Sequence, residues 1–218
     1  VQVKYGDFWF EPGLVALDGS AKHSKWPGLA TAGAAAYQRT RTGVVKALLW
    51  TIPEGYPQTA AASEQFAAEN AVDKVREGDK VDLLVDCLAV QLCHRNLRKA
   101  SRCQAKYGGI WKQPKMRDRI NIIHNSKSHM SEEQALKAGT NMGWWAANQE
   151  VDALGQGRCV SRACAGIVQV LPTGRGQAVS AREVLHECVE ISQDDDGADP
   201  SSFGPDESVT GHGSGGQE

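Results

Sequence analysis

Four acidic residues occupy positions from which an α/β fold could bring them together. Asp18 and Asp86 each end a short apolar run that is typical of a β-strand. Glu64 lies in the first turns of a helical pattern, and Asp152 lies on a later one. The strand ends of an open sheet are where α/β proteins build their sites. We therefore expect these four carboxylates to share one site.

Carboxylates that converge in one site imply cations. They repel one another unless positive charge neutralises them. Hard oxygen ligands favour Mg²⁺, with Mn²⁺ as a substitute. Two such ions about 4 Å apart can activate a water and stabilise the leaving oxygen of a phosphodiester. The acids thus predict a two-metal site that acts on a nucleic-acid backbone.

Each acid has a plainer explanation when it is taken alone. Asp18, which precedes Gly19, fits ordinary turn chemistry. Glu64 fits an exposed position on a helix. Asp152 follows Asn148 by four residues, which suits an ordinary helix face. The prediction of a site rests on the conjunction of all four acids in this order.

The elements that must position these acids follow from hydrophobic periodicity and turn residues. Three closely spaced apolar runs predict an antiparallel meander, at 13–17, 30–38 and 44–52. Helices and strands then alternate, with helices at 59–76, 88–103 and 144–154 and strands at 81–85 and 119–124. This order predicts an α/β fold with a five-stranded mixed sheet (β-β-β-α-β-α-β-α) flanked by helices, in which the later strands pair in parallel.

Two helical segments carry more specific expectations. In the helix 88–103, Leu88, Leu92 and Leu97 are expected to face inward and the cationic residues outward. The last helix, 144–154, is expected to be closed by Gly155. A capping box is also predicted for a short helix between these two, at Ser131 and Gln134.

The chain divides into three predicted parts. Residues 1–157 form the α/β domain, and residues 158–191 form an extension of uncertain structure, in which 167–171 fits a strand and 180–191 a helix. Residues 192–218 are acidic and rich in Gly and Ser, which predicts disorder. Because this tail has no Lys or Arg, the remainder of the chain is mildly basic, which is compatible with a polyanionic ligand.

The motifs around the four acids resemble those of the ribonuclease H family, of the bacterial and retroviral type. The resemblance covers roughly residues 10–155. It rests on Asp18-Gly19-Ser20, on the segment from Thr59 through Glu64 to Ala68, on Val85-Asp86, on Lys127-Ser128-His129 and on the segment from Asn148 to Leu154. The resemblance implies a ribonuclease H-like domain at 1–157, with its fold and its two-metal chemistry.

The resemblance also implies a role for each matched residue. Asp18, Glu64, Asp86 and Asp152 would be the metal-binding quartet and, with a histidine, the catalytic residues. His129 would be the loop histidine that moves a proton as the leaving group departs, a role that suits a side chain titrating near neutral pH. His124 is the alternative histidine. Ser20 would lie on the nucleic-acid side of the site.

Some residues depart from the family's pattern. Ala60 and Ala61 stand where the family usually has asparagines that help to distinguish the RNA strand from the DNA strand. Cys87 and Leu88 replace a pair that is often polar. These departures leave the metal site whole and weaken the case for strict recognition of a hybrid. The stretch 129–148 is also longer than usual, so either it contains an inserted helix or His129 is the wrong histidine.

A strongly basic segment lies between residues 92 and 127, where ten cations accompany the single acid Asp118. It resembles the basic protrusion with which some family members hold a duplex. Lys and Arg neutralise phosphates and release counterions, and an aromatic side chain can pack on a sugar. The alternative is a solvated helix face. The expected nucleic-acid contacts are Arg95, Arg98, Lys99, Arg102, Lys106, Trp111 and Lys112.

The cysteines and termini bear on the cellular context. Six cysteines in 218 residues do not form a disulfide scaffold, and reduced thiols of an intracellular protein are the default. A zinc site at Cys159, Cys164, His186 and Cys188 is disfavoured because the spacing is unusual. The longest apolar runs are too short to span a membrane. The chain begins with Val1, so we expect a piece of a longer intracellular protein, in the cytoplasm or nucleus.

Three functions compete. The first is a metal-dependent endonuclease that cuts the RNA strand of an RNA–DNA hybrid, as the ribonuclease H domain of a retroelement polyprotein with a reverse transcriptase in the same parent chain. The second is a catalytically weak or inactive nucleic-acid-binding module of the same fold. The third is a transposase or integrase of the wider superfamily. The early helix acid Glu64 disfavours the third, and the presence of all four acids disfavours the second.

Overall fold

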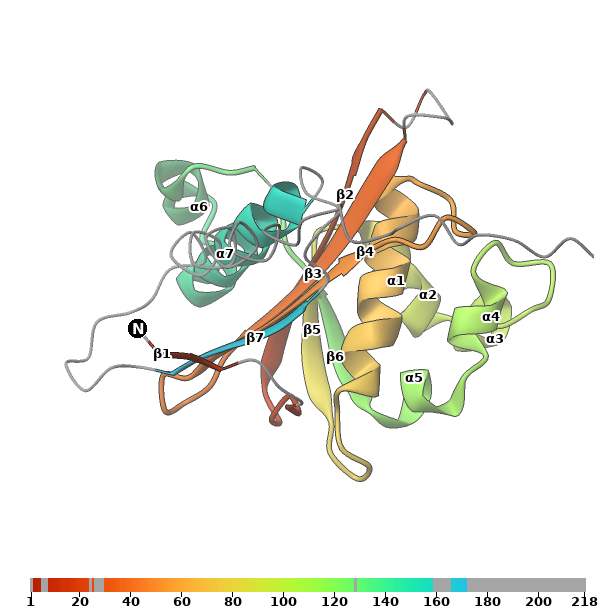
Figure 1. Ribbon diagram of the computed structural model, residues 1–218, viewed down its shortest axis with the longest axis horizontal. Coiled ribbons are helices and arrows are strands. Elements are labelled where there is room, and N and C mark those ends of the chain that lie inside the picture. Colours follow the sequence, from red (N-terminus) through yellow and green to blue (C-terminus); the bar gives the residue numbers. More distant parts are fainter. Residues whose placement is uncertain are drawn as a thin grey trace, which may run out of the picture.

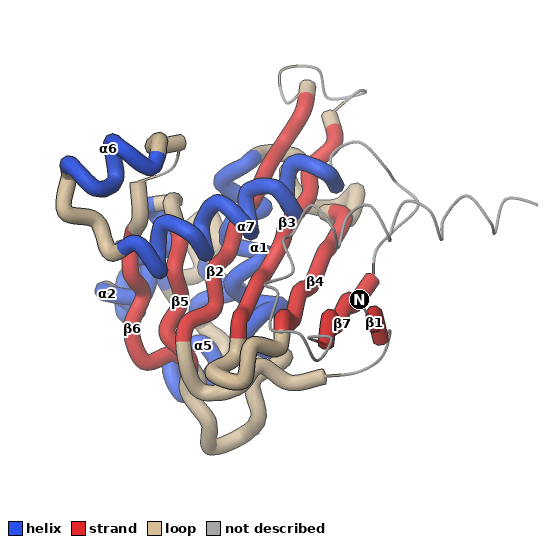
Figure 2. The backbone as a smooth tube through the Cα atoms, turned by 90° about the vertical axis from the view of Figure 1, so that its left-hand side faces the viewer, coloured by secondary structure: helices blue, strands red, loops and turns tan. Residues whose placement is uncertain are grey.

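The computed structural model describes residues 2–4, 8–23, 25, 30–127, 129–158 and 166–171. Its centre is a seven-stranded sheet of order β1-β7-β4-β3-β2-β5-β6 (Figure 2). The strands are β1 (Gln2–Lys4), β2 (Leu14–Lys22), β3 (Thr31–Arg39), β4 (Val45–Thr51), β5 (Val81–Val85), β6 (Ile120–Asn125) and β7 (Gly166–Leu171). β2, β3 and β4 form an antiparallel meander, and β5 and β6 run parallel to β2.

Helices cover both faces of the sheet (Figure 1). One face carries α1 (Ala60–Asp73), α2 (Leu88–Arg95), α3 (Leu97–Ala100), α4 (Gly108–Trp111) and α5 (Pro114–Asp118). The other face carries α6 (Glu132–Lys137) and α7 (Met142–Arg158). The predicted order β-β-β-α-β-α-β-α is therefore confirmed for the five strands from β2 to β6. β7 confirms the strand expected at 167–171, and β1 pairs with it to extend the sheet.

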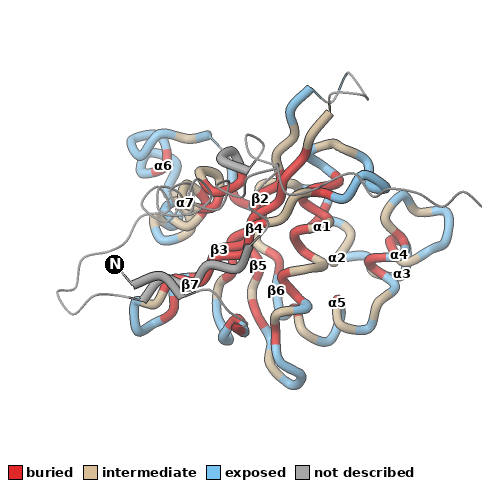
Figure 3. The backbone as a smooth tube through the Cα atoms, viewed as in Figure 1, coloured by how far each residue is buried: buried red, intermediate tan, exposed pale blue. Residues whose placement is uncertain are grey.

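Two apolar cores hold these layers together, one on each face of the sheet (Figure 3). The larger lies between the sheet and α1, where Leu17, Leu48 and Leu83 meet Ala67, Ala71 and Val72 of the helix. The smaller lies under α7, whose Val151 and Leu154 pack against Ala16, Ala35 and Leu49. Alanines crowd both contacts, so the two helices lie close to the sheet. In the described part of the chain, no helix is long and apolar enough to cross a membrane.

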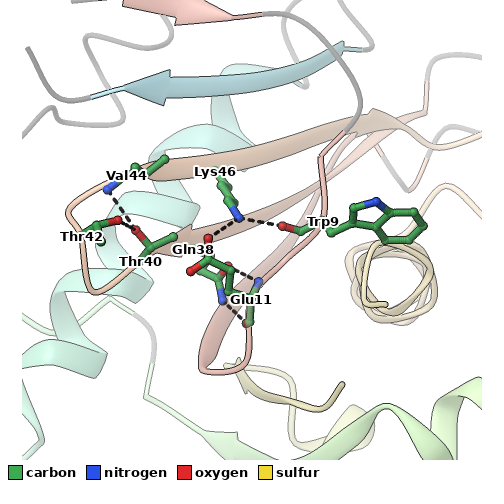
Figure 4. Close-up of polar contacts among 7 residues, drawn as sticks. All are labelled: Trp9, Glu11, Gln38, Thr40, Thr42, Val44 and Lys46. Carbon is green, nitrogen blue, oxygen red and sulfur yellow. Dashed lines mark hydrogen bonds and ion pairs between the residues drawn. The ribbon is translucent and has the colours of Figure 1, made fainter. Parts of the chain in front are cut away.

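The segment that leads into β2 is fixed to the meander by a polar cluster around the buried side chains of Lys46 and Gln38 (Figure 4). The Lys46 ammonium group on β4 donates to the Trp9 carbonyl at 2.7 Å and to Glu11 Oε1 at 2.8 Å. The Gln38 side chain accepts from the Glu11 N–H and donates to the Glu11 carbonyl, at 2.9 and 2.7 Å. A buried ammonium group is tolerated where it is paired and hydrogen-bonded in this way. The cluster anchors the start of the strand that carries Asp18.

The predicted helix 88–103 is wrong in detail. It breaks at Asn96, whose side chain accepts a hydrogen bond from the Lys99 N–H and starts α3 as a separate turn. Leu88 and Leu92, expected to face inward, are 53% and 52% exposed. The periodic pattern misled because α2 packs on β6 partly through a polar residue, Gln91, which donates to the Ile123 carbonyl.

Other local expectations had mixed outcomes. The capping box at Ser131 and Gln134 is confirmed at the start of α6. Gly155 does not close the last helix, because α7 continues to Arg158. The helix expected at 180–191, the tail 192–218 and the residues Cys159, Cys164, His186 and Cys188 lie outside the described residues.

Trp111 was assigned to the nucleic-acid surface, and the structure contradicts this assignment. Its side chain is buried in the larger core, where the indole N–H donates to Gln65 Oε1 at 2.7 Å. The Trp111 ring also lies beside that of His94, with 6.4 Å between their centroids. The residue therefore fixes α4 to α1 rather than contacting a ligand.

Trp111→Phe tests this correction. The change keeps an aromatic ring but leaves the buried Gln65 carbonyl without its donor. We expect the free energy of unfolding to fall by about 1–3 kcal/mol, the usual penalty of an unsatisfied buried polar group. Denaturant unfolding measures it, with Trp9→Phe at a 38% exposed position as the control. Unchanged stability with weakened duplex binding would restore the surface assignment.

Candidate active site

Three of the four predicted acids converge in one pocket. Asp18, Glu64 and Asp86 each offer a carboxylate oxygen, and these oxygens lie within 4.8 Å of one another. The pocket that they line has a volume of about 330 Å³ and also includes Asp152 and His129. The remaining lining residues are Gly19, Ser20, Ala60, Ala61 and Cys87. The sequence thus identified all the acids of this pocket.

Asp18 reaches the pocket from a different place than expected. It does not end its strand but lies in the middle of β2, paired with Ala35 of β3. The parallel register of β2 and β5 aligns Ala16 with Leu84, which places Asp18 level with Asp86. β5 ends at Val85, whereas β2 continues to Lys22 because β3 still pairs with it. The site therefore lies where one strand stops and its neighbour continues.

Glu64 is held by its helix and by the backbone of β2. Thr59 caps α1 by accepting a hydrogen bond from the Ala62 N–H, which fixes the first turn. Glu64 Oε1 accepts a hydrogen bond from the Gly19 N–H at 2.9 Å. A Cβ atom on Gly19 would collide with the backbone of Ser63 and Glu64. Glycine at this position lets α1 approach β2 closely enough to deliver its carboxylate.

Asp152 approaches from the opposite face of the sheet, on α7. Its Oδ2 lies 3.5 Å from His129 Nδ1, and the His129 side chain is 72% exposed at the rim of the pocket. His124, the alternative histidine, instead packs on Trp144 with 4.3 Å between the ring centroids. The long stretch after His129 contains α6, so the inserted helix is the explanation that the structure supports.

Burial and like charge disfavour the ionised carboxylates. The pKa of Asp18 is raised to about 8, first by burial and then by the charges of Asp152 and Asp86. Burial is also the main cause that raises the pKa of Glu64 well above its usual value, with Asp86 and Asp18 adding to it. The pKa of Asp152 is raised by burial, and His129 opposes this shift. Positive charge in the pocket would favour the ionised carboxylates and so offset the cost of ionising them.

The residues present fit a divalent cation. Asp18 Oδ2 and Glu64 Oε2 are buried oxygens that have no hydrogen-bond partner. Buried polar atoms without a partner are rare and call for a ligand or water. Here they belong to acidic groups whose oxygens suit Mg²⁺ or Mn²⁺. Asp18, Glu64 and Asp86 would hold the cation, and Asp152 lies beside them.

Two glycines of the site were not recognised from the sequence as functional. Gly19 was interpreted as turn chemistry and Gly155 as a helix stop. Both instead lie at close backbone approaches, since a Cβ atom on Gly155 would collide with the Asp18 carboxylate. For Gly155 the sequence did contain a signal. A glycine inside a helix destabilises that helix relative to alanine, so its presence suggests that a side chain would not fit there.

The predicted nucleic-acid contacts lie in two places. Six cations are exposed on the segment from α2 to the α4–α5 connection, namely Arg95, Arg98, Lys99, Arg102, Lys106 and Lys112. Ser20 lines the metal pocket itself, and its hydroxyl donates to the Gly155 carbonyl at 2.8 Å. α2 begins at Leu88, just after Asp86, and the first of these cations, Arg95, lies at the far end of that helix.

Comparisons with known proteins give distant structural likenesses. No protein-family model and no curated protein matches the chain. One similar solved structure is LC9-RNase H1, described as a type 1 RNase H with the type 2 active-site motif. It is 14% identical, with a TM-score of 0.49 over 76% of this chain and 80% of that one.

A second similar structure is a foamy viral protease-reverse transcriptase in complex with an RNA/DNA hybrid. It is 18% identical, with a TM-score of 0.40 over 66% of this chain. The chain spans only 19% of that protein's length. Independently of these likenesses, the strands β4-β3-β2-β5-β6 form the five-stranded mixed sheet with the order and connections that the resemblance implied, so the expected fold is confirmed.

The raised pKa of Asp18 predicts how stability depends on pH without divalent cations. The folded state holds a proton that the unfolded chain releases near pH 4, so this stability is full below pH 4 and is lost as pH rises through about 8. Each such proton contributes a slope of about 1.4 kcal/mol per pH unit. The free energy of unfolding, measured in EDTA at pH 5 and at pH 9, gives this loss of stability.

Three comparisons test the assignment of this slope. Asp18→Asn should reduce the slope because one carboxyl group with a raised pKa is gone while Glu64 remains. Adding Mg²⁺ to the wild type should restore its stability at pH 9. Asp82→Asn, which changes a β5 acid that Asn121 hydrogen-bonds outside the pocket, should leave the slope unchanged. A wild-type protein that is equally stable at both pH values would contradict the raised pKa.

Proposed function

We propose that this chain is a metal-dependent endonuclease that hydrolyses the RNA strand of RNA–DNA hybrids by a two-metal-ion mechanism. The observation that carries the proposal is the convergence of Asp18, Glu64 and Asp86, two of which have buried oxygens without partners. Such a set of oxygens has little use in a purely structural pocket, since it destabilises the protein unless cations are bound. This argues against a module that only binds nucleic acid.

Each acid has a distinct task in the proposed mechanism. When bound, two Mg²⁺ ions supply an activated water and stabilise the leaving oxygen of the phosphodiester. Asp18 and Glu64 form the buried base of the pocket, where Gly19 N–H orients the Glu64 carboxylate. Asp86 and Asp152 complete the ring of carboxylates from β5 and α7. Their negative charge sets the number of cations that the site holds.

His129 is proposed to move the proton. Its exposed ring can reach solvent, and its Nδ1 faces Asp152 at 3.5 Å. An imidazole ring at this position can deliver a proton to a departing oxygen. The exposed position also lets the side chain turn between the pocket and bulk water.

The basic segment is proposed to hold the duplex. Its exposed cations can contact consecutive phosphates along a strand that also enters the pocket. Closer to the acids, the pocket is lined by Ala60, Ala61 and Cys87, and the exposed Leu88 follows. Alanine and leucine side chains offer no hydrogen bonds to a ribose hydroxyl. We therefore expect looser selection of hybrids over other duplexes than a polar lining would give.

The resemblance of the sequence motifs supports a wider setting for this activity. We propose that the chain is the ribonuclease H domain of a retroelement polyprotein, with a reverse transcriptase domain in the same parent chain. Such a protein would meet its hybrid substrate inside the cell, in the cytoplasm or nucleus. A reverse transcriptase would supply the hybrid by copying RNA into DNA.

Asp86→Asn tests the chemistry separately from the fold. The variant keeps its size and hydrogen bonding but loses a charge that the cations require, so Mg²⁺-dependent cleavage should fall by several orders of magnitude. The melting temperature without metal should be unchanged or higher, because Asp86 no longer raises the pKa of Glu64 and Asp18. Cleavage of a labelled hybrid beside matched RNA and DNA duplexes, with Mg²⁺ or EDTA, measures the effect.

The outcomes of this experiment are decisive. The matched control is Asp82→Asn, which should cut at the wild-type rate. An Asp86→Asn protein that cuts hybrid nearly as fast as the wild type refutes the two-metal mechanism. A wild-type protein that binds duplexes and never cuts them favours the inactive binding module instead.

Replacing Arg98, Lys99 and Arg102 together by alanine tests the duplex contact. We expect weaker hybrid binding and a salt dependence that is flatter by up to about three ion equivalents, since each phosphate contact contributes a slope near −0.9. Cleavage at saturating substrate should change little. Binding measured between 50 and 200 mM salt, roughly the range over which such contacts are lost, gives the slope.

A second triple variant provides the matched control. Arg41, Arg76 and Lys80 are exposed at the other end of the sheet, in the turns after β3 and before β5. Their replacement removes the same net charge without touching the basic segment. If both triple variants lose the same affinity and slope, only general charge matters and the proposed contact is wrong.

A further inference from the structure

We infer that Gly155 and Ser20 are positioning residues that set the spacing between α7 and the buried carboxylate of Asp18. The inference rests on the proposed metal site. The main observation is steric, because a side chain at Gly155 and the Asp18 carboxylate would occupy the same space. Ser20, on the same strand as Asp18, ties the α7 backbone at this point.

The contact is tight on the side of Gly155. A Cβ atom there would collide with Asp18 Oδ2 and lie only 3.0 Å from Asp18 Cγ. Asp18 cannot move aside freely, because its side chain is buried and β2 is paired with β3 from Ala16 to Lys22. Even an alanine would therefore displace either the carboxylate or the helix.

Contacts with the sheet also hold α7 in place. Val151 and Leu154 are buried against Ala16, Ala35 and Leu49 of the sheet. Asp152 lies three residues before Gly155 and hence on the same side of α7. A displacement of α7 at Gly155 would therefore shift Asp152 relative to Asp18. Because Gly155 has no side chain, the carboxylates of Asp18 and Asp152 can line one pocket.

Ser20 adds a polar tie at the same point. Its hydroxyl donates to the Gly155 carbonyl at 2.8 Å, across 135 residues of sequence. Ser20 and Asp18 lie two residues apart on β2 and so project toward the same face. The strand that supplies Asp18 thus also holds the helix that supplies Asp152. Ser20 was expected to contact nucleic acid, and this bond gives it a different task.

A glycine within a helix is otherwise unfavourable. Alanine is the better helix former, so a Gly→Ala change in an unconstrained helix tends to stabilise the protein. Gly155 lies inside α7, which continues to Arg158. Its presence is explained by the close approach to Asp18 and not by a helix end.

The test is Gly155→Ala, with Mn²⁺ affinity as the readout that a purely structural role would not change. We expect the dissociation constant of Mn²⁺, measured by calorimetry on the full chain, to rise at least tenfold. Hybrid cleavage should show a lower kcat with an unchanged KM. Gly109→Ala is the matched control, since that helical glycine of α4 has open space around it and should bind Mn²⁺ as the wild type does.

Ser20→Ala keeps the inference falsifiable if Gly155→Ala does not fold. It removes the tie with almost no change in volume, and we expect Mn²⁺ to bind at least threefold more weakly with KM for the hybrid unchanged. A Gly155→Ala protein that folds and binds Mn²⁺ with wild-type affinity overturns the inference. So does a Ser20→Ala protein in which only KM rises, because Ser20 would then contact the nucleic acid.

The proposed function can fail separately. A wild-type chain that binds Mn²⁺ but cuts no duplex refutes the nuclease and leaves the comparison of Mn²⁺ affinities intact. A wild-type chain that does not bind Mn²⁺ at all overturns both.

Discussion

The repulsion among buried carboxylates is the constraint on which this structure depends. Asp18 and Glu64 are almost fully buried, and each has an oxygen without a partner. In water these groups would ionise near pH 4, but burial and their neighbours shift both pKa values upward. The folded chain therefore stores an unfavourable arrangement that cations would relieve.

Such an arrangement persists only if the rest of the fold holds it firmly. β2 supplies Asp18 from its middle, where β3 still pairs with it through Ala35. The polar cluster of Lys46, Glu11 and Gln38 anchors the segment before that strand, and the alanine-rich contact of α1 with the sheet fixes Glu64. The stability of these layers offsets the cost of crowding the acids.

The sequence predicted the fold order and the identity of the acids, because both depend on local patterns. Alternating elements determine the order of strands and helices, and an acid after an apolar run marks a place near a sheet edge. The environment of each residue was harder to predict. Trp111 lies between aromatic and basic residues in the sequence, yet its partner is Gln65, 46 residues away.

The same limit explains the errors on α2 and at the glycines. Leu88 and Leu92 have helical spacing, but periodicity alone does not say which face meets the sheet, and a buried Gln91 occupies that face. Gly155 stands where a helix could end, and only the position of Asp18 shows why the residue is small. Sequence patterns describe one element at a time, whereas these residues are determined by contacts between elements.

The position of the pocket follows from the unequal lengths of neighbouring strands. β5 ends at Val85 while β2 continues to Lys22, so on the β5 side of Asp18 no strand separates the two faces of the sheet. Glu64 on one face and Asp152 on the other can therefore line the same pocket. α2 starts at the end of β5 and carries the basic segment outward from there. A single strand end thus joins the two faces of the sheet and brings the acids together at the point where α2 begins.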